Sequence, residues 1–96
     1  MPRYLIERTW DPLDEEALSA AAARSKQLID EQFPDIVWEH SHVAVDEEDQ
    51  VRSFCVYSAP DADQVRAHAA VLGDHQIDRI HELSGDLSPA DFPAGG

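Results

Sequence analysis

Residues 36–59 read IVWEHSHVAVDEEDQVRSFCVYSA and hold two apolar stretches on either side of the acidic segment DEEDQ. Stretches rich in β-branched and aromatic residues predict strands over 36–45 and 51–59, and the acidic segment predicts the turn of a hairpin. The hairpin decides the fold, because the rest of the chain supplies one predicted strand and one predicted helix on each side of it.

Before the hairpin, the sequence predicts a strand followed by a helix. Residues 3–10, RYLIERTW, have the composition of a strand, which the pair Asp11-Pro12 ends. Apolar residues then recur with helical spacing over 15–32, and acidic residues stand at the start of this segment, where the helix dipole favours them.

After the hairpin, the sequence predicts a second helix and a fourth strand. Asp61 followed by Gln64 has the form of a capping box, and Gly73 marks the end of the helix. A short strand follows at about 77–83. The order β-α-β-β-α-β is typical of the ferredoxin-like α+β fold, a four-stranded antiparallel sheet with both helices on one face. We therefore predict one domain over residues 1–83.

The last segment, residues 84–96, reads SGDLSPADFPAGG and is small, polar and rich in Pro and Gly. This composition predicts a flexible C-terminal tail, or an arm that docks Phe92 on a partner.

The strand at 51–59 has apolar residues on both faces. Phe54 and Val56 point one way, while Cys55 and Tyr57 point the other way. Two helices cover only one face of the predicted sheet, so a second copy packed on the open face is the simplest cover. We predict a homodimer of the dimeric α/β barrel type.

The charge balance limits the classes of partner. The 96 residues include 20 acidic residues against seven Lys and Arg, for a net charge of −13. Such a surface disfavours nucleic acid and anionic membranes and attracts cations, although acidity often serves solubility alone. The start of the chain has no signal-peptide pattern, and a cytoplasmic location is expected. The single cysteine, Cys55, excludes an intramolecular disulfide.

The histidines are the main functional signal. His40 and His42 lie two residues apart in a predicted strand, so their side chains share a face with Cα atoms about 7 Å apart. The pair has the spacing to bind one metal ion, and Trp38 is expected on the same face. Such a pair taken alone is more often two half-exposed residues.

Other residues are candidate ligands beside this pair. His68 lies on the inward stripe of the second predicted helix, where a buried histidine with a hydrogen-bond partner is the commoner explanation. His75 lies in the predicted loop after that helix. The role of Cys55 depends on the hairpin register. If paired residue numbers sum to 95, His40 faces Cys55; if they sum to 96, Ser41 does, and Cys55 points to the opposite face.

Catalytic motifs are absent from the sequence, which has no GxSxG, Walker loop, GxGxxG or HExxH. The strand carboxylates of Glu7, Glu39 and Glu82 are expected to be exposed or paired with arginines. The arginines available for this pairing are Arg3, Arg8, Arg52 and Arg79. A non-enzymatic role is therefore the leading expectation.

Four blocks of sequence carry a family resemblance. They are MPRYLIER at 1–8, VWEHSHV at 37–43, FCVYSAP at 54–60, and the run His68…Gly73…His75…Asp78-Arg79-Ile80…Glu82. Over roughly residues 2–83 the chain resembles small bacterial domains catalogued as domain of unknown function 4242, which include nickel-binding proteins. The resemblance implies a dimeric ferredoxin-like fold, Ni²⁺ as the metal, and His40, His68 and His75 as ligands.

The leading hypothesis is a non-enzymatic, dimeric metal-binding protein that stores, buffers or senses a divalent transition metal such as Ni²⁺. Imidazole, thiolate and carboxylate ligands suit such ions. The candidate ligands are His40, His42, His68 and His75.

The alternative is a small-ligand binder or a cofactor-free enzyme of the monooxygenase or isomerase type. It predicts a cavity between sheet and helices, lined by Trp38, Tyr57 and a base such as His40 or His68. Histidines inside such a cavity would favour this alternative, and histidines clustered at the surface would favour metal. A third hypothesis is a dimer without a ligand that acts through its acidic surface or its tail.

Overall fold

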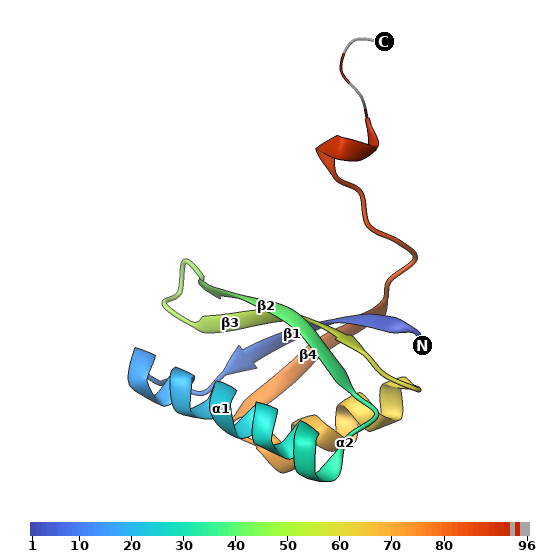
Figure 1. The fold of residues 1–96 in the computed structure, drawn as a ribbon. Coiled ribbons are helices and arrows are strands. Elements are labelled where there is room, and N and C mark those ends of the chain that lie inside the picture. Colours follow the sequence, from blue (N-terminus) through green and yellow to red (C-terminus); the bar gives the residue numbers. More distant parts are fainter. Residues whose placement is uncertain (93, 95–96) are drawn as a thin grey trace.

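The computed structural model describes residues 1–92 and residue 94, and it has the predicted ferredoxin-like α+β fold. The elements in chain order are β1 (Arg3–Trp10), α1 (Glu15–Gln32), β2 (Val37–Val45), β3 (Val51–Ser58), α2 (Ala62–Leu72), β4 (His75–Glu82) and a short 3₁₀ helix (Pro89–Asp91). The strands pair antiparallel in the order β2-β3-β1-β4. Figure 1 shows both helices on one face of the sheet and the C-terminal segment leading away from it. None of the helices in the described residues is long and apolar enough to cross a membrane.

Side-chain caps explain why both helices begin where the sequence predicts. Asp14 accepts a hydrogen bond from the backbone N–H of Ala17 (2.8 Å), and Asp61 accepts one from the backbone N–H of Gln64 (2.9 Å). Each bond satisfies one of the N–H groups that the first turn of a helix leaves without a partner. Gly73 ends α2 with a φ of 72°, a value that glycine adopts without steric cost.

The cap at Asp61 makes a testable contribution to stability. Replacing Asp61 with Ala should lower the free energy of unfolding by about 1 kcal/mol, because the N–H of Gln64 loses its acceptor. Urea unfolding followed by circular dichroism measures the difference. Asp63→Ala is the matched control, because Asp63 lies two residues later in the first turn and makes no capping bond. An equal loss in both variants would contradict the role of the cap.

The fourth strand begins two residues earlier than predicted, at His75 rather than at about residue 77. Gly73 and Asp74 both have positive φ, 72° and 60°, so the chain reverses direction within two residues of the helix end. His75 therefore pairs with Trp10 of β1, and the prediction that His75 lies in a loop is wrong.

From His40 onward, the hairpin has the second of the two registers considered above, in which paired residue numbers sum to 96. Ser41 pairs with Cys55 and His42 with Phe54, whereas Trp38 pairs with Tyr57. The change in register marks a β-bulge at Glu39, where β2 carries one additional residue. The bulge moves Trp38 to the helix-covered face, so the expectation that it shares a face with His40 is wrong. Cys55 is on that covered face as well and cannot join a site with His40.

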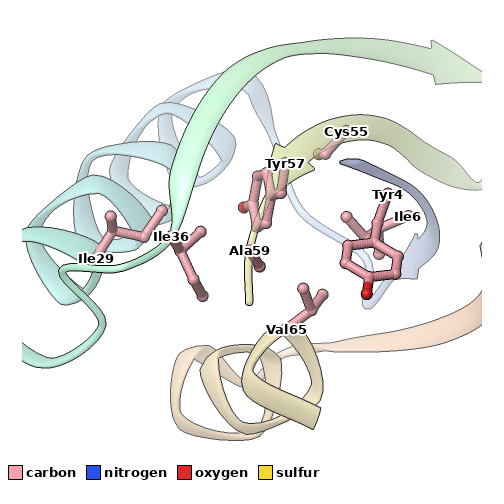
Figure 2. Packing of buried hydrophobic residues seen from close by; sticks show 8 residues of the cluster. All are labelled: Tyr4, Ile6, Ile29, Ile36, Cys55, Tyr57, Ala59 and Val65. Atoms are coloured by element: carbon pink, nitrogen blue, oxygen red, sulfur yellow. The ribbon is translucent and has the colours of Figure 1, made fainter. Parts of the chain in front are cut away.

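The core lies between the sheet and the helices. Ile6, Tyr57 and Val65 are at most 1% exposed, and Figure 2 shows them with the other buried residues of the main cluster. Burial of this apolar surface is the main favourable contribution to folding. The core thereby holds β1, β3 and α2 in fixed positions around the sites described next.

Candidate functional site

The open face of the sheet carries the histidine pair of β2. His40 and His42 are both exposed, and their ring centroids lie 5.4 Å apart. They stand opposite Val56 and Phe54 of β3 on this face. The two side chains share a face because they follow the bulge, after which the strand alternates regularly.

The separation of the two rings fits joint binding of one ion. With metal–nitrogen bonds of about 2.0–2.1 Å, two imidazoles on one first-row ion have ring centroids about 4.5–5.5 Å apart. The rings of His40 and His42 lie within this range, at 5.4 Å. Their exposure leaves the remaining coordination positions open to water or to another chain. The pair therefore has the geometry for two ligands and not for a complete metal site.

Within the described part of one chain, no third ligand joins this pair. Among the described residues, no group of three or more His, Cys, Asp or Glu side chains is placed to hold a metal. The next histidine on the open face, His81, belongs to β4 at the far edge of the sheet and binds Glu7, with 2.7 Å between Nε2 and Oε2. Two strands separate it from β2, so it cannot share an ion with His40.

His68 of α2 lies in the interior of the domain. It is fully buried, its Nε2 is 3.2 Å from the hydroxyl of Ser25, and its ring meets those of Phe33 and Tyr57 edge-on. Burial, followed by the nearby positive charge of Arg8, lowers its pKa to about 4. His68 is thus a neutral core histidine, on the other side of the sheet from the pair on β2.

His75 at the start of β4 is also on the helix side of the sheet. Its Nδ1 is 2.7 Å from the backbone carbonyl of Gly73, and its ring stacks on Trp10 with centroids 4.5 Å apart. Burial lowers the pKa of His75, and Arg8 lowers it further against the opposing effect of the bond to Gly73. A divalent cation beside His68 or His75 would meet the charge of Arg8, so the structure gives these two positions less support than the exposed pair.

Arg8 is the residue that sequence reasoning placed wrongly. It was expected to pair with a strand carboxylate, but it is 2% exposed, and no ion pair to it occurs among the described residues. Its guanidinium carbon lies 5.3 Å from the centre of the Tyr57 ring. A cation–π contact contributes about 0.5–2 kcal/mol, less than the several kcal/mol that burial of a charge costs. The alternation of β1 could have revealed it, since Arg8 has the same parity as the core residue Ile6.

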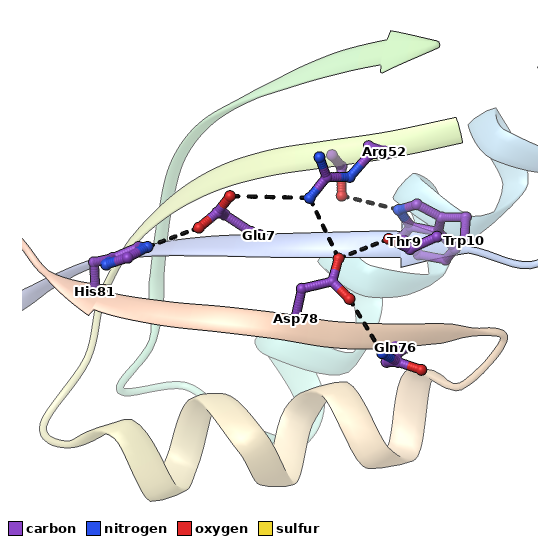
Figure 3. A network of polar contacts seen from close by, with 8 residues as sticks. Glu7, Thr9, Trp10, Arg52, Gln76, Asp78 and His81 are labelled. Carbon is purple, nitrogen blue, oxygen red and sulfur yellow. Dashed lines mark hydrogen bonds and ion pairs between the residues drawn. The ribbon is translucent and has the colours of Figure 1, made fainter. Parts of the chain in front are cut away.

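The other strand charges form pairs on the open face, as the sequence predicted. Arg3 binds both carboxylate oxygens of Glu39, at 2.8 and 3.0 Å. This bidentate bond to Arg3, reinforced by the hydroxyl of Ser58, lowers the pKa of Glu39. Figure 3 shows the second network, in which Arg52 reaches Glu7 and Asp78. These carboxylates are engaged with cations of their own chain.

A cavity of about 250 Å³ lies between α1 and the helix-covered face of the sheet. Trp38 and Tyr57 line it, as the small-ligand hypothesis predicted. His40 and His68, the bases named in that hypothesis, are not among its lining residues in the described chain. His40 and His42 are instead paired at the surface, whereas His68 and His75 lie on the helix side, so the described histidines do not form one cluster.

A family model described as nickel responsive protein SCO4226-like matches residues 4–83, so the chain belongs to the SCO4226-like family. This confirms the relationship to a small nickel-responsive family that the sequence blocks indicated, and it is consistent with a metal-related role. None of the curated proteins matches the chain.

Two solved structures support the fold. The C-terminal domain of the MgtC protein from Mycobacterium tuberculosis has a TM-score of 0.59 at 13% identity, covering 88% of each chain. Formyltetrahydrofolate deformylase from Burkholderia mallei has a TM-score of 0.55 at 15% identity over 85% of this chain. The present chain corresponds to only 28% of that enzyme. At these identities the likeness concerns the fold alone.

Proposed function

We propose that this member of a nickel-responsive family is a non-enzymatic binder of a divalent transition metal, with Ni²⁺ as the first candidate. The observation that supports it is the exposed His40–His42 pair, whose ring centroids are 5.4 Å apart. Neutral imidazole is a preferred ligand of Ni²⁺, Cu²⁺ and Zn²⁺. The net charge of −13 raises the concentration of cations near the surface. Storage, buffering or sensing of the metal would each use such a site.

A second copy of the chain would complete the site. Two imidazoles leave most coordination positions of the ion open, and the open face carries the half-buried apolar residues Leu5 of β1 and Phe54 of β3. A copy packed on this face would cover them and bring a second histidine pair to the interface. We therefore propose a homodimer through the open face whose stability increases when metal is bound.

Calorimetric titration of metal-free protein with Ni²⁺ tests this proposal. The wild-type chain should bind with a micromolar Kd, and His40→Ala should weaken binding at least about tenfold, because one of two protein ligands is lost. His81→Ala is the matched control, since His81 is also exposed on the open face but lies at its opposite edge. It should bind as the wild type does.

Two outcomes of the titration would contradict the proposal. Heats equal to those of dilution for Ni²⁺, Zn²⁺ and Cu²⁺ would exclude a metal site, and unchanged binding by His40→Ala with loss in His75→Ala would move the site from the β2 pair to His75. Binding should weaken in acid, because protons compete with the metal for imidazole nitrogen. Sedimentation velocity with and without Ni²⁺ tests the coupling to dimerisation.

A further inference from the structure

The cavity beneath α1 has a shape and a chemistry that the metal proposal does not use. Its volume of about 250 Å³ is comparable to that of about eight water molecules. Val43 at its edge is 51% exposed, so the cavity opens between α1 and β2. Its walls are mostly apolar, with Trp10, Leu18, Trp38 and Leu72 among them. An apolar chamber of this size suits the body of a small organic molecule.

Arg8 gives the cavity a positive charge that nothing in the described chain neutralises. It lines the cavity, is 2% exposed, and its Nε and Nη2 are buried without a hydrogen-bond partner. Arginine cannot lose its charge by deprotonation, unlike a buried lysine or histidine. The lining residues of the cavity in the described chain include no Asp or Glu. A buried guanidinium with unpaired N–H donors and no neighbouring carboxylate is stabilised when an anion binds from outside the chain.

Two serine hydroxyls in the lining of the cavity add hydrogen-bond donors to those of Arg8. The indole N–H of Trp10 donates to the hydroxyl oxygen of Ser53, and that of Trp38 donates to Ser41, each at 2.9 Å. An indole nitrogen is only a donor, so both serine oxygens act as acceptors in these bonds. The hydroxyl hydrogen of each serine is therefore available for another acceptor, and both serines line the cavity.

We propose that this cavity binds a small organic monocarboxylate with an apolar or aromatic body, whose carboxylate is held by the guanidinium of Arg8. The planar fork of arginine matches the two oxygens of a carboxylate, which suits it to this role. A single buried positive charge balances a monoanion, whereas a phosphate dianion would leave one charge uncompensated in an acidic protein. The apolar walls contact the body of the ligand, and the volume of about 250 Å³ has room for a body the size of one aromatic ring.

The chain carries its own reporter of this binding. It has two tryptophans, Trp10 and Trp38, and both line the cavity. Titration with acetate, 3-methylbutanoate, benzoate and phenylacetate, followed by tryptophan emission, should show saturable change for at least one of the larger three. We expect a Kd of about 0.1–1 mM, as is usual for ligands of this size. The neutral amide of the best acid should bind at least about tenfold more weakly.

Arg8→Met is the decisive variant, because it keeps an unbranched side chain of similar length and removes only the charge and its donors. It should abolish the preference for acid over amide while remaining folded. His40→Ala should bind the acid as the wild type does, since His40 is on the opposite face, so failure here and failure of the metal proposal are distinguishable. Equal binding of acid and amide, unchanged binding in Arg8→Met, or no saturable response to any of the four acids would overturn the proposal.

Discussion

Lowering the pH from 6.5 to 4 is expected to reduce the free energy of unfolding by up to about 3 kcal/mol through His68 alone. Its pKa in the folded chain is lowered to about 4 from an ordinary value of 6.5, first by burial and then by Arg8. Well above pH 6.5 the side chain is neutral in both states and contributes no pH dependence. Between 6.5 and 4 the unfolded chain binds a proton that the folded chain does not, so stability falls as the pH falls through this window.

Urea unfolding at a series of pH values measures this effect. His68→Gln should make the profile between pH 6.5 and 4 less steep, because glutamine does not titrate there, and the slope that remains includes the contribution of His75, whose pKa is also lowered by burial. His81→Gln is the control, since His81 is exposed and should leave the profile of the buried group in place. A slope in His68→Gln as steep as in the wild type would show that another group is responsible.

Replacing Arg8 with Met should raise the free energy of unfolding in the absence of any ligand, by about 1–4 kcal/mol. The guanidinium is 2% exposed and its Nε and Nη2 make no hydrogen bond among the described residues, so the variant loses a buried charge and gains apolar packing. For a domain of this size each kcal/mol raises the melting temperature by about 4–8 °C. Most substitutions of buried residues destabilise, which makes the expected sign distinctive.

Thermal unfolding followed by circular dichroism checks the sign. Arg66→Met is the matched control, because Arg66 is exposed on α2 and its replacement should change stability by less than about 0.5 kcal/mol. The variant at Arg8 should also raise the pKa of His68 without restoring it to 6.5, since burial is the larger cause of its lowering. A lower melting temperature for Arg8→Met would mean that Arg8 has a stabilising partner in the protein as it exists in solution.

Much of the fold follows from local signals in the sequence. The first strand and the first helix have the predicted bounds, because proline, acidic caps and helical periodicity act within a few residues of where they occur. Asp61 and Gly73 delimit α2 for the same reason. The order of the elements is then enough to predict the fold, because few topologies are compatible with the order β-α-β-β-α-β.

The site was less predictable because it depends on features without a local signal. The bulge at Glu39 adds one residue to β2, and only the pairing with β3 reveals it. It reversed the predicted face of Trp38 and left the histidine pair as predicted. The burial of Arg8 is not indicated by its residue type, because arginine is rarely buried without a charged partner, and only its shared parity with Ile6 places it on the core side. His75 moved from loop to strand because Asp74 adopts a positive φ.

The same bulge separates two chemistries along a single strand. Counted from either end of β2, the alternation of side chains is regular, but the two counts are out of phase at Glu39. Trp38 and Ser41 can therefore stand beside the carboxylate-sized chamber while the imidazoles between and after them stand on the reverse side. The bulge residue Glu39 stabilises this change of alternation, because its carboxylate accepts hydrogen bonds from Arg3 and from the hydroxyl of Ser58. A deletion at position 39 would thus remove the bulge and leave Trp38 opposite Tyr57 and His40 opposite Val56, so both surfaces would keep their side chains. Pairing without a bulge while Glu39 is retained would instead place Trp38 and His40 on one face.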